Sequence, residues 1–265
     1  MLVRESENPK AVIVLIHGAF EHSGRYEWLV NQLNHNGFHI VYGDLPGQGT
    51  NKGRRGFIKS FDDYIVTAEK WINHALTFEL PVFLLGHSMG GLTAIRALQE
   101  KQYPIQGVLL SSPALGIHNV PEKPLYFVSK VLNYILPTIL FKTNIHSEMA
   151  TRNDAFYARD LADPLYLRKV SVRWYHEFEK AINEAFEKIN DYPEVPTLIL
   201  QAGEDLLVPI DQVESWYEKL SIQDKEIKIW ENLYHEVFNE PERDEVLTMA
   251  LHFLNTQLVE EKQEG

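Results

Sequence analysis

Short apolar runs rich in β-branched residues alternate with helical patterns along most of the chain. The first two runs, at 12–16 and 38–42, flank a helical pattern over 26–36 that stops at Gly37. Such runs are typical of strands buried on both faces, and strands separated by helices usually pair in parallel. The order therefore predicts an α/β fold with a mainly parallel central sheet flanked by helices.

The same alternation continues toward the C-terminus. Further strands are predicted at 82–85, 107–111, 197–201 and 226–230. Helices are predicted at 89–99, at 211–220, after Ser60, and after Asn239-Glu240-Pro241. Two helix starts carry the spacing of a capping box: Ser60 with Asp63, and Asp211 with Glu214. The last helix is expected to bury four residues at helical spacing: Val246, Ala250, Phe253 and Leu254.

Residues 113–192 break the alternation, because they carry helical patterns without a β-run between them. We expect them to form an inserted helical cap, with residues 1–112 and 193–265 forming the core below it. A chain of 265 residues that is 45% hydrophobic is long enough to bury such a core as one domain with an insertion.

The most apolar stretch of the insertion is 125–141. Lys130, Asn133 and Pro137 interrupt it, so it falls short of the roughly 20 apolar residues of a membrane span. The stretch can pack on the core, or it can present an apolar wall to a pocket. In the second case, Leu132 and Ile135 are expected to contact an acyl chain.

The composition argues against several classes of protein and site. The chain has no cysteine, which excludes disulfides and thiolate metal sites. Its net charge of -12 argues against nucleic acid as a partner and against electrostatic docking to anionic lipid. The first ten residues, MLVRESENPK, lack the apolar core of a signal peptide. We expect a cytoplasmic protein without cofactor or bound metal.

The segment Gly86-His87-Ser88-Met89-Gly90 fits the pattern GxSxG between a predicted strand and a predicted helix. In that context the serine lies on a sharp turn at the carboxyl edge of the sheet, where its hydroxyl is exposed for nucleophilic attack. The flanking glycines are expected because a Cβ there would collide with the neighbouring strand or helix. The pattern therefore indicates Ser88 as a nucleophile, with a structural turn serine as the alternative.

A serine nucleophile needs a base and a carboxylate that orients the base, in the chain order serine, acid, histidine. Asp205 follows the strand 197–201 in QAGEDLLVP, where such an acid should lie. Glu204 is its neighbouring rival. The insertion contributes three further carboxylates, for which a solvated or capping role is expected: Asp154, Asp160 and Asp163.

Only two of the eleven histidines come after Asp205. His252 lies inside the last predicted helix, where a packed or surface role is expected. His235 follows the strand 226–230 through a short loop, so it can lie over the sheet edge. We therefore assign His235 as the base.

The oxyanion of such a reaction needs two backbone N–H groups. One is expected from Met89 and the other from Ala19 in the loop after the first strand. His17 and His22 flank that loop position, and we expect them to hold the loop rather than to take part in the chemistry.

Other motifs are incomplete or ambiguous. HEVFN at 235–239 starts like a zinc-protease helix but has Asn239 where the second histidine is needed. GQGTNKG at 47–53 lacks the spacing of a phosphate loop. A basic run can form a solvated loop or contact a lipid phosphate: Lys52, Arg54, Arg55 and Lys59.

Four segments resemble the monoacylglycerol lipase and lysophospholipase group of the α/β-hydrolase superfamily: HGAFEHSGRY (17–26), GHSMGG (86–91), AGEDLLVP (202–209) and LYHEVFNEPER (233–243). The resemblance implies an α/β-hydrolase fold with a cap, a triad of Ser88, Asp205 and His235, and oxyanion donors at Ala19 and Met89. Where many relatives have a histidine, this chain has Gln48, which leaves the contacts of that loop open.

The resemblance also implies a substrate class. It is similar to bacterial lysophospholipases, which favours an ester of a monoacyl lipid, either a monoacylglycerol or a lysophospholipid. It implies at most transient membrane contact through the cap and leaves the oligomeric state open. The alternatives are a small-ester carboxylesterase or an aminopeptidase-like hydrolase on the same scaffold. A non-catalytic binding protein is less favoured, because all three triad positions are kept.

Overall fold

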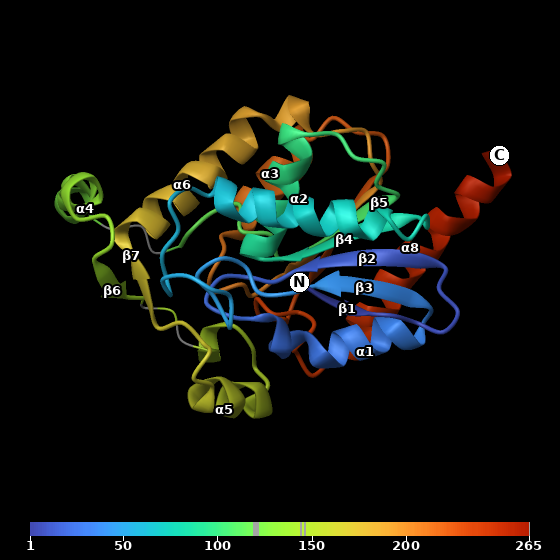
Figure 1. Ribbon diagram of the computed structural model, residues 1–265, viewed down its shortest axis with the longest axis horizontal. Coiled ribbons are helices and arrows are strands. Elements are labelled where there is room, and N and C mark those ends of the chain that lie inside the picture. Colours follow the sequence, from blue (N-terminus) through green and yellow to red (C-terminus); the bar gives the residue numbers. More distant parts are fainter. Residues whose placement is uncertain (119–121, 144, 146, 265) are drawn as a thin grey trace.

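The computed structural model describes residues 1–118, 122–143, 145 and 147–264, with side chains through residue 259 (Figure 1). Its main sheet has seven strands in the order β1-β3-β2-β4-β5-β8-β9. These strands are β1 (Leu2–Arg4), β2 (Ala11–Ile16), β3 (Phe38–Tyr42), β4 (Val82–His87), β5 (Gly107–Ser111), β8 (Thr197–Ala202) and β9 (Lys225–Trp230). The helices are α1 (Glu27–His35), α2 (Asp62–Leu76), α3 (Met89–Glu100), α4 (Lys123–Ile135), α5 (Asp154–Ala162), α6 (Val172–Glu187), α7 (Ile210–Lys219) and α8 (Arg243–Glu264).

The predicted parallel sheet is confirmed. All neighbouring strands from β3 to β9 pair in parallel, and only β1 is antiparallel to its neighbour. The three residues of β1 are exposed, so the apolar signal that marked the other strands is missing there. The edge strand β1 was therefore not predicted.

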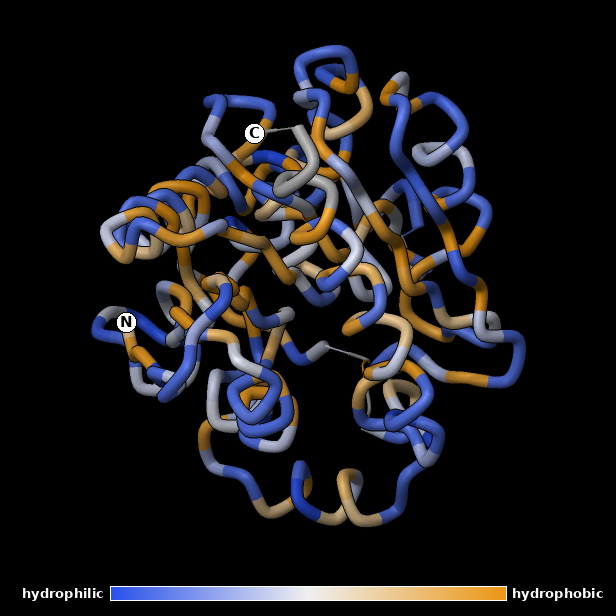
Figure 2. The backbone as a smooth tube through the Cα atoms, turned by 90° about the vertical axis from the view of Figure 1, so that its right-hand side faces the viewer, coloured by the Kyte–Doolittle hydropathy of each residue, from blue (hydrophilic) through white to orange (hydrophobic). Residues whose placement is uncertain are grey.

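Helices cover both faces of the sheet. One core contains side chains of α1 and α8, and the other contains side chains of α2, α3, α6 and α7. Successive residues of β2 alternate between the two cores, because neighbouring side chains of a strand point to opposite faces. Figure 2 shows hydrophobic residues concentrated along the interior strands and hydrophilic residues in the outer loops.

The predicted helix starts were less accurate than the strands. The α2 helix begins at Asp62, and the carboxylate of Asp63 accepts a hydrogen bond from the Lys59 backbone N–H rather than closing a box with Ser60. The α7 helix begins at Ile210 without a side-chain cap, so Asp211 lies inside its first turn. Both capping boxes are therefore wrong. The last helix begins at Arg243, two residues beyond the predicted opening, and it buries the four predicted residues.

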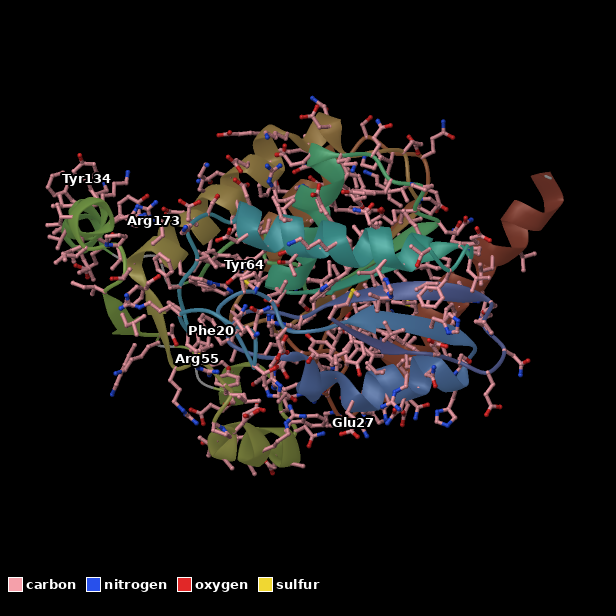
Figure 3. All side chains as sticks on the ribbon, viewed as in Figure 1. Phe20, Glu27, Arg55, Tyr64, Tyr134 and Arg173 are labelled. Carbon is pink, nitrogen blue, oxygen red and sulfur yellow. The ribbon has the colours of Figure 1, made fainter. Side chains whose placement is uncertain are left out.

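The insertion is not purely helical. Between α4 and α6 it also contains two short strands, β6 (Leu140–Lys142) and β7 (Lys169–Ser171), which pair antiparallel. The α6 helix packs on α3 and contributes Trp174 and Phe178 to the core. The α4 helix buries none of its residues, and Tyr134 lies at its outer side (Figure 3).

Among the described residues, no helix is long and apolar enough to cross a membrane.

Candidate active site

The carboxyl ends of the parallel strands meet at one edge of the sheet. Ser88 directly follows β4, and the loop with Ala19 follows β2. Asp205 lies three residues after β8, and His235 lies five residues after β9. Parallel pairing therefore brings together four segments that are far apart in the sequence. The insertion, which leaves β5 at this same edge, lies beyond it (Figure 1).

Ser88 has a strained backbone. Its φ of 51° and ψ of -118° are unusual for a residue with a side chain. A Cβ added at Gly86 would approach the carbonyl oxygen of Gly90 to 2.5 Å, and one added at Gly90 would overlap the carbonyl oxygen of Ile16 in β2. The predicted need for flanking glycines is confirmed. The turn aims Ser88 into a cavity between the sheet edge and the insertion.

Asp205 and His235 form a buried pair. His235 Nδ1 lies 2.7 Å from Asp205 Oδ2. The other carboxylate oxygen accepts hydrogen bonds of 2.9 Å from the N–H groups of Leu207 and Val208. Gln201 Nε2 donates a longer bond of 3.3 Å to Oδ2. The carboxylate is therefore fixed from both sides and can hold the imidazole in one orientation.

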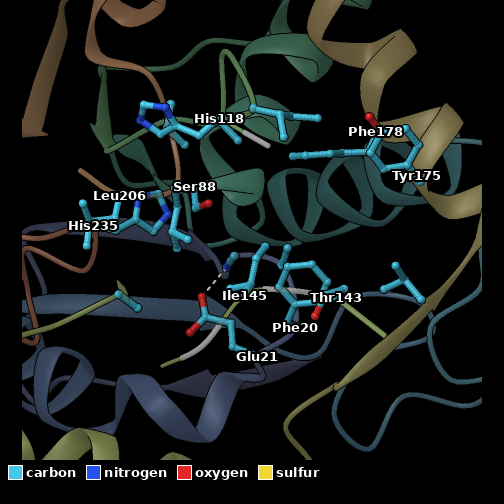
Figure 4. A pocket seen from close by; sticks show the side chains of 18 of the residues that line it. Phe20, Glu21, Ser88, His118, Thr143, Ile145, Tyr175, Phe178, Leu206 and His235 are labelled. Carbon is cyan, nitrogen blue, oxygen red and sulfur yellow. Dashed lines mark hydrogen bonds between the residues drawn. The ribbon is translucent and has the colours of Figure 1, made fainter. Parts of the chain in front are cut away.

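The other candidate acids and bases lie elsewhere. Glu204 is exposed, and its backbone N–H bonds to the Leu233 carbonyl. His252 is exposed on α8. Ser88 and His235 line the same cavity and lie side by side in Figure 4, although Ser88 Oγ forms no hydrogen bond to His235 in the part of the chain that the structure describes.

The electrostatics of the pair favour an ionised acid beside a basic imidazole. Burial opposes the charge of Asp205, but His235 and the two backbone N–H groups outweigh it and lower the pKa of Asp205. Burial would lower the pKa of His235, but Asp205, and then Glu236 and Glu21, raise it above its ordinary value. Burial and the nearby His235 lower the pKa of His87 to about 4, so His87 is neutral at pH 7.

The loop after β2 is held by its own side chains. Leu45 N–H donates to His17 Nε2 at 2.9 Å, so His17 Nδ1 is the donor to the Gly18 carbonyl. His22 Nδ1 accepts from Gly24 N–H, and its Nε2 lies 2.7 Å from Asp163. Both histidines hold the loop, as expected. Among the described residues, no group accepts a hydrogen bond from the backbone N–H of Ala19 or Met89.

A buried ionic cluster lies behind the catalytic loops, and sequence reasoning missed it. Arg25 donates to three carboxylates: Glu21 at 2.5 Å, Asp160 at 2.6 and 3.1 Å, and Glu236 at 2.9 and 3.0 Å. All four side chains are buried. The expectation of a solvated or capping Asp160 is therefore wrong. The motif HGAFEHSGRY contained Glu21 and Arg25, but no pattern linked them to Asp160 or Glu236.

Asp154 and Asp163 differ from Asp160. Asp154 is an exposed residue in the first turn of α5, as expected for a solvated or capping carboxylate. Asp163 pairs with His22 and accepts a 2.7 Å bond from Leu165 N–H. It therefore links the insertion to the loop after β2.

The cavity has a volume of about 580 Å³ and walls of unequal chemistry. Its apolar wall comes from the insertion: Phe141, Val170, Trp174 and Phe178. Tyr175 and Phe178 lie across the cavity from Ser88 and His235 (Figure 4). Glu21, Tyr166 and Glu236 form a polar wall.

The predicted wall from 125–141 is right in part. Leu125 and Phe141 line the cavity. Leu132 and Ile135 do not, and Ile135 is exposed, because α4 turns its apolar face outward. The expectation that these two residues contact an acyl chain is wrong.

The basic run has a third role that was not considered. Arg54 donates to the Thr138 carbonyl, and Arg55 donates to the Leu165 carbonyl at 2.8 Å. Both arginines therefore attach their loop to the insertion, whereas Lys52 and Lys59 are exposed. Gln48 is buried in the same loop, and its amide has no hydrogen-bond partner among the described residues.

The described residues contain no cluster of three or more histidine, aspartate or glutamate side chains that could hold a metal ion.

Comparison with known proteins agrees with this architecture. The chain matches the model of the family described as "Serine aminopeptidase, S33" over residues 7–242. It is 47% identical over 250 residues to phospholipase YtpA of Bacillus subtilis, which covers 94% of this chain and 96% of that protein. It is 33% identical over 256 residues to the monoglyceride lipase of Homo sapiens, which covers 93% of this chain and 82% of that protein.

A solved structure supports the same grouping. The monoacylglycerol lipase of Paleococcus ferrophilus has a TM-score of 0.87 to this chain at 29% identity, with 97% of this chain and 98% of that one covered. The resemblance seen in the four sequence segments is therefore confirmed. The chain belongs to this family of α/β-hydrolases, and it is a serine hydrolase of the lipase and phospholipase type.

Proposed function

We propose that the protein hydrolyses carboxylic esters of monoacyl lipids through an acyl-enzyme on Ser88. His235 is the general base, Asp205 orients it, and the backbone N–H groups of Ala19 and Met89 bind the oxyanion. One observation carries the proposal: a nucleophile-type turn and a 2.7 Å carboxylate–histidine pair border one cavity, whose far wall is apolar.

The reaction follows the double displacement of serine hydrolases. Ser88 Oγ attacks the ester carbonyl carbon while His235 Nε2 takes the hydroxyl proton. The tetrahedral intermediate collapses, and the leaving alcohol oxygen receives that proton. A water then attacks the acyl-enzyme after losing a proton to His235, and the second collapse returns the proton to Ser88 and releases the fatty acid.

The two walls of the cavity suggest which end of the substrate each side binds. An acyl chain gains free energy against Phe141, Val170 and Trp174 because it leaves water there. The alcohol part then faces the polar wall with Glu21 and Glu236. A single apolar cavity of about 580 Å³ suits one acyl chain better than two. Relatives named monoglyceride lipase support this choice.

The charge of the polar wall favours an uncharged glycerol over an anionic head group. The attraction of Arg25 outweighs burial and lowers the pKa of Glu21, and it lowers that of Glu236 to about 2, so both are anionic. Arg25 has five N–H donors, and the carboxylates accept a bond from each one. It therefore has no donor left for a phosphate.

A lysophospholipid is the second candidate. The relative from Bacillus subtilis is named a phospholipase. Lys142 lines the cavity on β6, away from the carboxylates, and could pair with a phosphate. A panel of head groups separates the two candidates.

Residues 113–192 serve as the cap in this proposal, and α4 makes transient contact with the membrane. The exposed apolar residues of this segment include Phe127, Val128, Val131 and Ile135. The segment 123–142 also carries Lys123, Lys130 and Lys142 and no acidic residue. It is thus locally cationic in a protein of net charge -12.

The test is a labelling and turnover experiment on purified protein. An active-site fluorophosphonate should add once, at Ser88, and Ser88→Ala should lower kcat by a factor on the order of 10⁴ to 10⁶. Monodecanoylglycerol, a matched lysophosphatidylcholine, a matched lysophosphatidylglycerol and dioleoylglycerol are assayed side by side. We expect the monoacylglycerol to react fastest. Labelling elsewhere, or faster turnover of the diacyl lipid, contradicts the proposal.

A further inference from the structure

Arg25 connects three segments that carry or cover the active site. Glu21 belongs to the loop after β2, and its Oε1 accepts a 2.5 Å bond from the Gly18 N–H, next to Ala19. Glu236 is the neighbour of His235. Asp160 lies on α5 of the insertion. One guanidinium therefore touches the oxyanion loop, the loop of the base, and the cap.

Asp160 holds Arg25 in its orientation. It makes a bidentate contact through both oxygens, with Nε at 3.1 Å and Nη2 at 2.6 Å. Bidentate pairs fix the plane of a guanidinium as well as its position. With that plane fixed, Nη1 is shared between Glu21 at 2.5 Å and Glu236 at 2.9 Å. The placement of both carboxylates thus depends on a residue of the insertion.

We infer that Asp160 is a positioning residue for catalysis, which acts through Arg25 on the oxyanion loop and on the loop that carries His235. The inference rests on the proposed function. It makes the second half of the insertion part of the catalytic apparatus as well as a cover for the acyl chain.

Further contacts attach this half of the insertion to the same two loops. Asp163 pairs with His22 in the loop after β2 at 2.7 Å. The backbone N–H of Glu236 donates to the Ala150 carbonyl at 2.8 Å. Glu240 is fully buried and accepts bonds from Thr151 and from Arg152 at 2.6 to 2.7 Å. Residues 150–163 are therefore fixed relative to both catalytic loops.

The location of the cluster argues against a purely structural role. Buried ion pairs contribute little net stability, because desolvation offsets their attraction. Here a single cation faces three carboxylates, a combination that stability alone does not favour. Burial, more than any neighbouring charge, raises the pKa of Asp160, which means that ionising it costs folding free energy. The cluster lies against the Ser88 cavity, which Glu21 and Glu236 line.

The experiment replaces one carboxylate oxygen and compares it with a matched control. Asp160→Asn keeps the shape of the side chain but removes the charge and one acceptor for Arg25. Asp154→Asn makes the same change on the same helix at an exposed position. Steady-state kinetics use p-nitrophenyl acetate, which does not fill the acyl wall, and p-nitrophenyl decanoate, which does. The unfolding temperature of each variant is measured in parallel.

For Asp160→Asn we expect kcat to fall about ten- to a hundredfold on both esters, with little change in KM, because misplacement on the scale of 1 Å has costs of this order. Asp160→Glu, which restores the charge, should recover part of kcat. Arg25→Lys lowers kcat as well, since lysine cannot make the bidentate contact. The Arg25→Lys/Asp160→Asn double variant should lose less than the product of the two single losses.

Three outcomes overturn the inference. The first is a kcat for Asp160→Asn equal to that for Asp154→Asn, and the second is a loss seen only on the decanoate, which would indicate an acyl-wall effect. The third is a lower unfolding temperature with unchanged kcat, which would indicate a structural role. Ser88→Ala runs in the same assay: if it stays active, the proposed function fails, and if it is inactive while Asp160→Asn is normal, only this inference fails.

Discussion

Phe141 offers a direct test of where the acyl chain lies. Its side chain is 38% exposed on β6, lines the cavity, and packs edge-on against Tyr175 at 6.3 Å. An acyl chain long enough to reach it would cover the exposed part of the ring. Full burial of such a ring gains about 1.5–3 kcal/mol, so covering 38% of it gains about 0.6–1.1 kcal/mol. Phe141→Ser should therefore lower kcat/KM for a long ester about three- to sevenfold.

The assay compares p-nitrophenyl acetate, butyrate and decanoate below their aggregation concentrations. Six added methylenes could contribute up to roughly 5 kcal/mol, which the ordering of the chain reduces. We expect kcat/KM of the parent protein to rise at least tenfold from butyrate to decanoate. In Phe141→Ser the decanoate should lose the stated factor, while the acetate is unchanged.

Phe127→Ser is the matched control. Phe127 lies in the same insertion and is 69% exposed, but it does not line the cavity. Its variant should keep the chain-length profile of the parent protein on these soluble esters. A flat profile in the parent, or an equal loss in both variants, would refute the placement of the acyl chain and favour a small-ester esterase.

Other predictions concern charge and pH. Only neutral His235 can act as base, so kcat/KM should rise with pH through a pKa above the ordinary histidine value, and Glu236→Gln, which removes a negative charge, should move this limb to lower pH. Asp205→Asn should lower kcat by about 10⁴, whereas Glu204→Gln should have a mild effect; the reverse result would exchange the two roles. The pKa of Glu236 falls from 4.5 to about 2 on folding, so its charge stabilises the fold above pH 4.5 and this stability is lost as pH falls toward 2. Thermal unfolding followed by circular dichroism should show this loss, and the loss should be smaller in Glu236→Gln.

The sheet and the nucleophile turn could be predicted because local rules determine them. A strand buried on both faces is necessarily apolar over its whole length, as β2 and β4 are. The turn at Ser88 requires glycine at 86 and 90 for steric reasons that the residues themselves reveal. Asp205 and His235 followed from chain order and from the ends of β8 and β9. Their assigned roles stay predictions, although their contact is observed.

The cluster around Arg25 could not be predicted, because it joins residues that are 4, 135 and 211 positions apart. A charged side chain in a sequence carries no signal for burial, and the usual expectation for a carboxylate such as Asp160 is solvent. Only the folded chain shows that its partner is Arg25. The same limit applied to α4, whose apolar pattern was visible although its outward direction was not.

The two halves of the insertion are attached to the core by bonds of different strength. The α4 helix is joined to α6 by surface contacts: Tyr126 with Glu179, Ser129 with His176, and Asn133 with Arg173. Such hydrogen bonds contribute about 0.5–1.5 kcal/mol each, and α4 buries no side chain that would add to them. Breaking a buried ion pair such as Asp160 with Arg25 costs about 3–5 kcal/mol. Displacing α4 to admit a lipid therefore costs less than displacing α5, so the substrate can enter beside α4 while α5 keeps the catalytic loops in place.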